Sequence, residues 1–253
     1  MRLVAVFFGL MMLAGCAAVQ DNPPGWDDSQ RVELYTRLGL GYMKQDRLSA
    51  SLEALEEALA IAPQNSAANH AMALLRFKLG DPAQARRRFR ISLASDPGNF
   101  GARNDFGTVL CELGAWADGI QQFRAALDNP FNTAVYRSQF GLGLCLMGVS
   151  DLIGAQDQFR AALVSRPNSS AILYQCAVVS FNLGENFSAR AFLERYFGTG
   201  PASADSLLLG VRNEQKLGAK DLVVQYASKL RSDYPASEQV EELRAFMVGG
   251  SND

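Results

Sequence analysis

The sequence predicts an all-α fold, a superhelical solenoid of paired helices, from the regular spacing of three kinds of residue. Five prolines recur at intervals of 34, 70, 34 and 34 residues: Pro63, Pro97, Pro167, Pro201 and Pro235. When each unit is numbered so that its proline is position 32, small side chains dominate position 8 and large apolar ones position 24. Position 8 holds Gly39, Ala73, Gly107, Gly143, Ala177 and Val211, and position 24 holds Leu55, Phe89, Phe123, Phe159, Leu193 and Ala227. A fixed period of this length indicates stacked copies of one small structural unit.

A period of 34 residues is that of the tetratricopeptide repeat, whose unit is a helix-turn-helix. Six repeats are expected within residues 31–236, at about 32–63, 66–97, 100–131, 136–167, 170–201 and 204–235. The small residues let the two helices of a repeat approach closely, and the proline follows the second helix because it cannot continue it. Four glycines fall where the chain reverses between the two helices, a place that favours a positive φ: Gly80, Gly114, Gly184 and Gly218.

Residues 1–15 resemble a bacterial lipoprotein signal peptide. Arg2 precedes an apolar run of eleven residues, 3–13, which is too short to span a bilayer. The following segment "LAGC" ends at Cys16 and resembles the lipobox, in which the cysteine receives a diacylglycerol before the signal is removed. The alternative is a buried N-terminal helix with an ordinary thiol. The lipobox interpretation predicts lipidation of Cys16, and Ala17 in place of aspartate favours sorting to the outer membrane.

Three segments outside the regular pattern have their own predictions. Residues 16–30 form the acylated N-terminus and a flexible tether, because they are too polar to bury a core. Two extra residues after the third repeat, in "LDNPFNTAVYR", predict a looser or bulged connection. Residues 237–253 predict a capping helix and a frayed tail, with Ser237 as the N-cap and Glu238 in the first turn. Such a helix would cover the apolar face at which a stack of repeats ends.

The composition argues against an enzyme, a metalloprotein or a nucleic-acid-binding protein. The chain has a formal net charge of −2 and a single histidine, His70. One histidine excludes a His-rich metal site, and the charge balance offers nothing to attract nucleic acid. We therefore expect no catalytic residue, bound metal, cofactor or small-molecule substrate. A Ser-His-Asp arrangement that uses His70 is the remaining alternative, but nothing in the sequence positions it.

Two groups of residues leave alternatives open. Cys111, Cys145 and Cys176 lie in successive first helices and are expected to be small buried hydrophobic residues, with a Cys111–Cys145 disulfide as the alternative. The basic cluster Arg86–Arg90 is expected to be a solvated helix face. Its alternative role is contact with anionic headgroups or an acidic partner.

The concave surface of the solenoid is the predicted site of recognition. In tetratricopeptide proteins a fixed set of first-helix positions lines that surface, and the corresponding residues here form two groups. The predicted partner-binding groove comprises Thr36, Leu40, Met43, Lys44, His70, Leu74 and Phe77. A secondary concave surface comprises Phe140, Leu144, Tyr174 and Phe181. Apolar side chains of this kind suit an amphipathic or apolar peptide, unless neighbouring helices cover them.

Together these features resemble the pilotin lipoproteins of the type IV pilus, also called pilus biogenesis/stability proteins. The resemblance rests on the lipobox, six repeats with the expansion after the third, and three segments: "YTRLGLGYMKQ" (35–45), "SLLLGVR" (206–212) and "LRSDYPAS" (230–237). Asp46 departs from the pattern, because a glycine is usual at that turn.

The resemblance implies a non-enzymatic protein facing the periplasm from the outer membrane of Gram-negative bacteria. Such pilotins bind the type IV pilus secretin subunit and promote its localisation and ring assembly there, which supports pilus extension and twitching motility. It also implies that the partner groove lies on the first repeats. The rival interpretations are another outer-membrane repeat lipoprotein, serving β-barrel assembly or cell-wall hydrolase regulation, and an enzyme with an unrecognised site.

Overall fold

The computed structural model describes residues 25–249, and within them every regular element is a helix. The helices run in chain order through α1 (Asp28–Lys44), α2 (Leu48–Ile61), α3 (Ser66–Lys78), α4 (Pro82–Ser95), α5 (Phe100–Glu112), α6 (Trp116–Leu127), α7 (Val135–Gly148), α8 (Leu152–Ser165), α9 (Ser170–Asn182), α10 (Asn186–Phe197), α11 (Ala204–Lys216), α12 (Lys220–Asp233) and α13 (Glu238–Gly249). The predicted signal peptide, the lipidation site Cys16 and the end of the predicted frayed tail lie outside the described residues.

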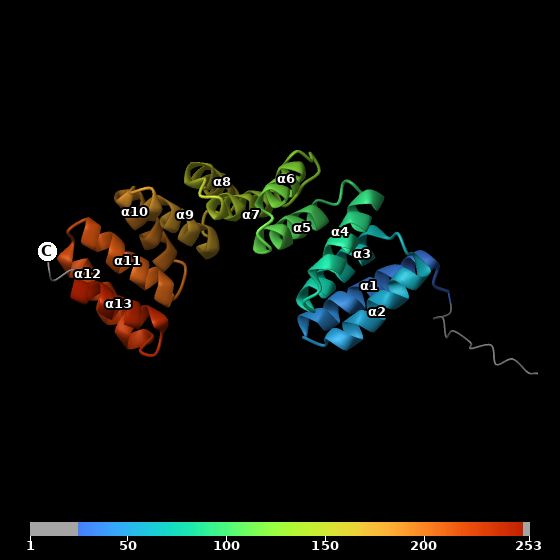
Figure 1. Cartoon of the computed structure of the whole chain (residues 1–253), viewed down its shortest axis with the longest axis horizontal. Coiled ribbons are helices and arrows are strands. Elements are labelled where there is room, and N and C mark those ends of the chain that lie inside the picture. The colour runs from blue at the N-terminus through green and yellow to red at the C-terminus, as the bar shows by residue number, and fades with distance from the viewer. Residues whose placement is uncertain (1–24, 250–253) are drawn as a thin grey trace, which may run out of the picture.

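The predicted all-α superhelical solenoid with a C-terminal capping helix is confirmed. Consecutive helices pair as α1 with α2, α3 with α4, and so on to α11 with α12. The pairs follow one another along a curved stack, with α13 packed on α11 and α12 at its end (Figure 1). Val240 and Leu243 of α13 are buried in one cluster with Leu207 and Leu230, so the last helix closes the core.

Close packing explains why small and large residues alternate between positions 8 and 24. A Cβ added to Gly107 would lie 2.8 Å from the Phe123 ring, and one added to Gly143 would lie 2.6 Å from the Phe159 ring. Both rings are fully buried, so neither can move aside. In these two repeats the first helix therefore rests directly on the large side chain of the second helix.

The turns inside the repeats adopt the backbone conformation that their glycines allow. Gly80, Gly114 and their equivalents Gly184 and Gly218 have φ between 73° and 78°. Asp46 takes the same role without being glycine, at φ 60°. Its carboxylate lies 2.8 Å from Lys78 Nζ, an ion pair that ties this turn to the second repeat.

The connection between α6 and α7 is longer than the others, as the inserted residues predict, but the expectation that it is looser is wrong. Asn132 is 7% exposed and its Nδ2 donates to the Ala126 carbonyl at 2.8 Å and to Ser138 Oγ at 3.0 Å. Ser138 Oγ in turn donates to Asn104 Oδ1 at 2.7 Å. The buried amide of Asn132 thus ties the connection to α6 and α7 directly, and Ser138 extends the network to α5.

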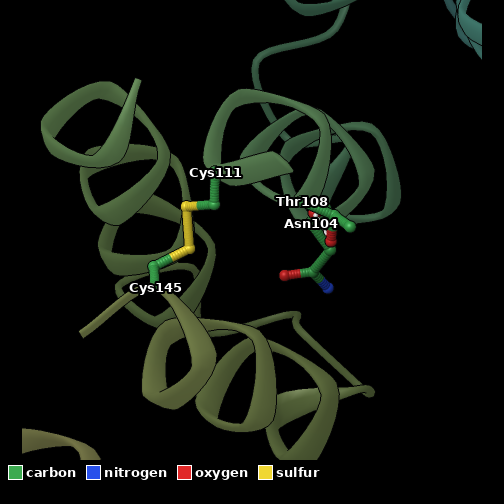
Figure 2. The surroundings of a disulfide bond; sticks show 4 residues. All are labelled: Asn104, Thr108, Cys111 and Cys145. Atoms are coloured by element: carbon green, nitrogen blue, oxygen red, sulfur yellow. Dashed lines mark hydrogen bonds between the residues drawn. A yellow bond between two sulfur atoms is a disulfide. The ribbon is translucent and has the colours of Figure 1, made fainter. Parts of the chain in front are cut away.

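Cys111 and Cys145 form a disulfide, so the preferred expectation of two free thiols is wrong. Their Cα atoms lie 5.7 Å apart, within the range a disulfide requires. The bond joins α5 to α7, the first helices of the third and fourth repeats (Figure 2). Cys176 remains a free, buried cysteine, as expected, and burial raises the pKa of its thiol to about 11.

The capping helix begins at Glu238, with Glu238 and Glu241 in its first turn. Ser237 precedes it as predicted, but its hydroxyl is buried and has no hydrogen-bond partner among the described residues. The prediction that Ser237 acts as a side-chain N-cap is therefore wrong.

Candidate functional site

A groove of about 460 Å³ lies on the concave face where the first three repeats meet, and we call it the N-terminal groove. Thr36 and Leu40 of α1 form one side, and His70 and Leu74 of α3 form the middle. The other side is the start of α5 and the connection that precedes it, residues 96–101. Most of its surface is apolar, as a groove for a partner's apolar side chains requires.

Four of the seven residues predicted for the partner-binding groove come together in it. Thr36 is buried, and its hydroxyl donates to the Val32 carbonyl at 2.7 Å, so it presents only its methyl side to the groove. Leu40 and Leu74 are half-buried against the helices below. They keep part of their surface open, which an apolar partner could cover.

The remaining three residues of the predicted groove lie outside its lining. Met43 is half-buried in the core cluster of the first repeat, and Lys44 is exposed at the end of α1. Phe77 packs against the cluster that contains Phe89 and Phe106. Met43 and Phe77 therefore contribute to the packing beside the groove without lining it.

A chain of polar side chains borders the groove and crosses three repeats. His70 Nε2 lies 2.8 Å from Asp105 Oδ2, and Arg137 Nη2 lies 3.2 Å from Asp105 Oδ1. Because one carboxylate joins the imidazole to the guanidinium, His70 is a positioned concave-face side chain. The sequence placed His70 on this face but missed both partners, which lie one repeat and two repeats further along the chain.

A second hollow, of about 310 Å³, lies further along the concave face between α5, α7 and α9, and we call it the central pocket. Phe140 and Leu144, both from the predicted secondary concave surface, line it. Its other lining residues include Asn104, Phe123, Tyr136, Arg137 and Ile172.

The other two residues of the predicted secondary surface lie outside the central pocket. Tyr174 is half-buried on the next core cluster, and burial, together with the nearby Asp205 carboxylate, raises its pKa to about 12. Phe181 carries the Lys216 ammonium over its ring, 4.6 Å from the centroid. Both side chains therefore pack against residues of the fifth and sixth repeats.

The basic cluster of α4 is divided between solvent and the neighbouring helix. Arg87 and Arg90 are exposed, as a solvated helix face requires. Arg88 is half-buried and donates to Asn69 Oδ1 at 3.1 Å. Its pKa is lowered by burial and by the adjacent charges of Arg87 and Arg76.

The described residues contain no group of three or more His, Cys, Asp or Glu side chains placed to hold a metal ion. Between residues 25 and 249 no helix is both long enough and apolar enough to cross a membrane.

Comparison with known proteins identifies the repeats and a full-length relative. Models of the tetratricopeptide repeat match residues 32–65 and 70–133. The chain is 27% identical over 247 residues to the type IV pilus assembly protein PilF of Pseudomonas aeruginosa, covering 96% of this chain and 98% of the relative.

Two solved structures share the fold at similar extent. A structure of Pseudomonas aeruginosa PilF superposes with a TM-score of 0.79 at 26% identity, covering 86% of this chain and 98% of that one. PilW, described as a widely conserved type IV pilus biogenesis factor, also gives a TM-score of 0.79, at 24% identity over 85% of this chain and 98% of PilW. The likeness therefore covers the whole solenoid, beyond single repeats.

Proposed function

We propose that this tetratricopeptide-repeat protein, which is similar to PilF along nearly its whole length, is a lipid-anchored pilotin of the type IV pilus. In this proposal it binds the pilus secretin subunit, accompanies it to the outer membrane and promotes assembly of the secretin ring. Pilus biogenesis and twitching motility depend on that step. The end-to-end similarity to PilF is the observation that carries the proposal, because it covers 96% of this chain and 98% of the relative.

The N-terminal groove is the proposed binding site for the secretin. It is the larger of the two hollows described above, and its half-buried Leu40 and Leu74 offer apolar surface without a complete cover. A partner segment with apolar side chains would remove that surface from water, at about 25 cal/mol for each Å² buried. The protein then works by presenting a surface, and no group in the groove is required to react.

A co-purification experiment tests the groove. Leu40→Asp combined with Leu74→Asp should abolish recovery of the secretin with the tagged protein from solubilised outer membranes, because a charge in the groove must be desolvated on binding. Leu38→Asp is the matched control, since Leu38 lies on the same helix, is 38% exposed and does not line the groove. Helix content from circular dichroism should be unchanged in both.

Secretin recovery that is equal in the groove variant and in the control would reject this groove as the binding site. Phe77→Asp is a poorer test than the sequence suggests. Phe77 lies outside the groove lining, so a loss of binding in that variant would not identify the groove as the binding site.

The proposed anchor is a lipid on Cys16, with the protein facing the periplasm. More than one acyl chain is needed for stable anchoring, as lipoprotein modification supplies. Labelled palmitate should be incorporated into the wild-type chain and not into Cys16→Ser. Wild-type protein should sediment with outer-membrane vesicles and Cys16→Ser should not; palmitate incorporation in the variant would reject this anchor.

A further inference from the structure

The basic cluster of α4 continues onto α5 and α6 as one surface. Arg87 and Arg90 are exposed on α4, and Arg124 is exposed on α6 at the repeat position that Arg90 occupies, 34 residues further along. A groove of about 400 Å³ on this side of the stack is lined by Arg90 and by Arg103 of α5. We call these four arginines the basic surface.

The charges of the basic surface are not neutralised within the fold. None of its arginines forms an ion pair with a carboxylate among residues 25–249. Arg103 donates instead to the Pro97 carbonyl at 3.1 Å and to Gln122 Oε1 at 3.3 Å. Asp118 is the one carboxylate in the groove lining, against two guanidinium groups. The surface is therefore locally positive on a chain whose formal net charge is −2, and it attracts an anionic partner.

An exposed phenylalanine lies beside the basic surface. Phe131 is 81% exposed in the connection between α6 and α7, the segment that the two inserted residues lengthen. Its backbone is held in place, because its N–H donates to Asn129 Oδ1 at 2.9 Å and Asn129 Nδ2 donates to the Gly98 carbonyl at 3.0 Å. Gly98 directly follows the proline whose carbonyl Arg103 binds. An aromatic ring on a fixed backbone next to cations suits a surface that enters a membrane interface.

The proposed lipid anchor keeps this part of the molecule near a bilayer. Gly25 is nine residues after Cys16, so the start of α1 can lie no more than about 30 Å from an acylated Cys16. Because the two helices of each repeat are antiparallel, α1 begins at the edge of the stack where the connections between repeats lie. Phe131 is in one of these connections, and Arg103 binds the carbonyl of another. The tether and the basic surface therefore share an edge.

We propose that the basic surface and Phe131 together dock on an anionic phospholipid bilayer, the one that the lipid of Cys16 enters. The arginines contact headgroup phosphates, and the ring of Phe131 enters the boundary between headgroups and acyl chains. An acidic protein segment would also be attracted to the arginines. A bilayer accounts for Phe131 as well, because it covers an isolated exposed ring without needing a hollow around it. The inference rests on the proposed lipid anchor for the nearness of the bilayer, and it adds the side on which the protein lies.

Co-sedimentation with vesicles tests the proposal. The protein is the mature chain carrying Cys16→Ser, which contains every described helix and no acyl chain. At low salt it should bind vesicles of phosphatidylethanolamine and phosphatidylglycerol and should not bind vesicles of phosphatidylcholine alone. Binding should be lost at about 1 M salt, where the screening length falls to about 3 Å.

Charge-reversal variants identify the surface. Arg87→Glu with Arg90→Glu should weaken binding at least about 25-fold, because each arginine near an anionic bilayer contributes about fivefold. Lys220→Glu with Arg231→Glu is the matched control, since both residues are exposed on α12, form no ion pair among the described residues and change the net charge equally. The control should bind within about threefold of the parent, because charges far from the bilayer are screened. Helix content from circular dichroism should be unchanged in both.

A polarity-sensitive fluorophore tests whether Phe131 enters the bilayer. Acrylodan attached to Phe131→Cys should emit at shorter wavelength when the phosphatidylglycerol vesicles are added. The same label on Phe187→Cys should not change, because Phe187 is 75% exposed at the start of α10, on the opposite edge of the stack. Cys176 is buried and should not take up the label.

Equal binding to both kinds of vesicle, equal loss in the two charge-reversal variants, or an emission shift at position 187 and not at 131 would each overturn the proposal. Absence of binding to the phosphatidylglycerol vesicles would also overturn it, and would leave an acidic protein segment as the occupant of the basic surface. Because the tested protein carries no acyl chain, such a failure rejects the docking surface alone. The palmitate test of Cys16 and the secretin test of the groove decide the proposed function separately.

Discussion

Removing the disulfide should cost the protein a large share of its stability. Replacing both Cys111 and Cys145 with alanine opens a loop that spans a sequence separation of 34 residues. For a loop of that length, the lost restriction of the unfolded chain corresponds to about 4 kcal/mol at 25 °C. Both cysteines are buried, at 7% and 1% exposed, so the alanines also leave small cavities at the α5–α7 contact.

Urea unfolding followed by far-ultraviolet circular dichroism measures this loss. Cys176→Ala is the control, because Cys176 is equally buried and has no disulfide. We expect the double variant to lose about 2–5 kcal/mol of unfolding free energy and the control to lose much less. If the two variants unfold at the same urea concentration with the same slope, the bond does not contribute as argued.

The remaining predictions concern thiol chemistry, a buried ion pair and helix packing. At pH 8 the Cys176 thiol should resist Ellman's reagent in the folded protein, because a thiol pKa of about 11 leaves almost no thiolate. Labelling of Cys176 should increase only as the pH approaches that pKa or as the chain unfolds. Arg190→Met should destabilise the protein by about 3–5 kcal/mol in urea or thermal unfolding. The reason is that the Glu214 carboxylate, which is 1% exposed, then loses the cation with which it forms an ion pair. A loss of unfolding free energy below about 1 kcal/mol would contradict this. Gly107→Ala should cost about 1–3 kcal/mol by forcing a Cβ against Phe123, whereas Gly41→Ala, in open space on α1, should stabilise by about 1 kcal/mol.

The repeat pattern was enough to predict the fold, because each repeat is built from local spacing. A small residue at position 8 and a large one at position 24 meet within a single repeat, so the sequence shows both members of the contact. Gly107 with Phe123 and Gly143 with Phe159 are two such pairs. The capping helix was predictable for the same reason, since its apolar face follows directly on the last repeat.

Contacts between repeats were harder to predict. Repeat numbering places Cys111 and Cys145 at different positions and so argued against a bond. Counted from the first residue of its helix, however, Cys111 is the twelfth residue of α5 and Cys145 the eleventh residue of α7. The two cysteines therefore lie at nearly the same height along their helices, because α7 begins one residue before the start of the fourth repeat as numbered from its proline. The connection that contains Asn132 was misjudged for a related reason. An insertion predicts extra length, but not that a buried amide within it will donate hydrogen bonds to two helices, α6 and α7.

The candidate groove was only partly predictable. Family positions on the first helices identify Leu40, His70 and Leu74, but they say nothing of the connection before α5, which forms one whole side. They also include Phe77, whose side chain is directed into the core cluster of the second and third repeats. The chain of His70, Asp105 and Arg137 crosses three repeats, and no period within one repeat reveals it.

Site-specific photo-crosslinking in living cells tests most directly whether the N-terminal groove holds the secretin. Ala67 is exposed and lines the groove, and Ala191 is an equally exposed alanine on α10, away from both hollows. A benzophenone amino acid at position 67 should crosslink to the secretin subunit, and the same amino acid at position 191 should not. Crosslinking from position 191 alone, or none from position 67 in cells that still assemble the secretin ring, would contradict a partner bound in this groove.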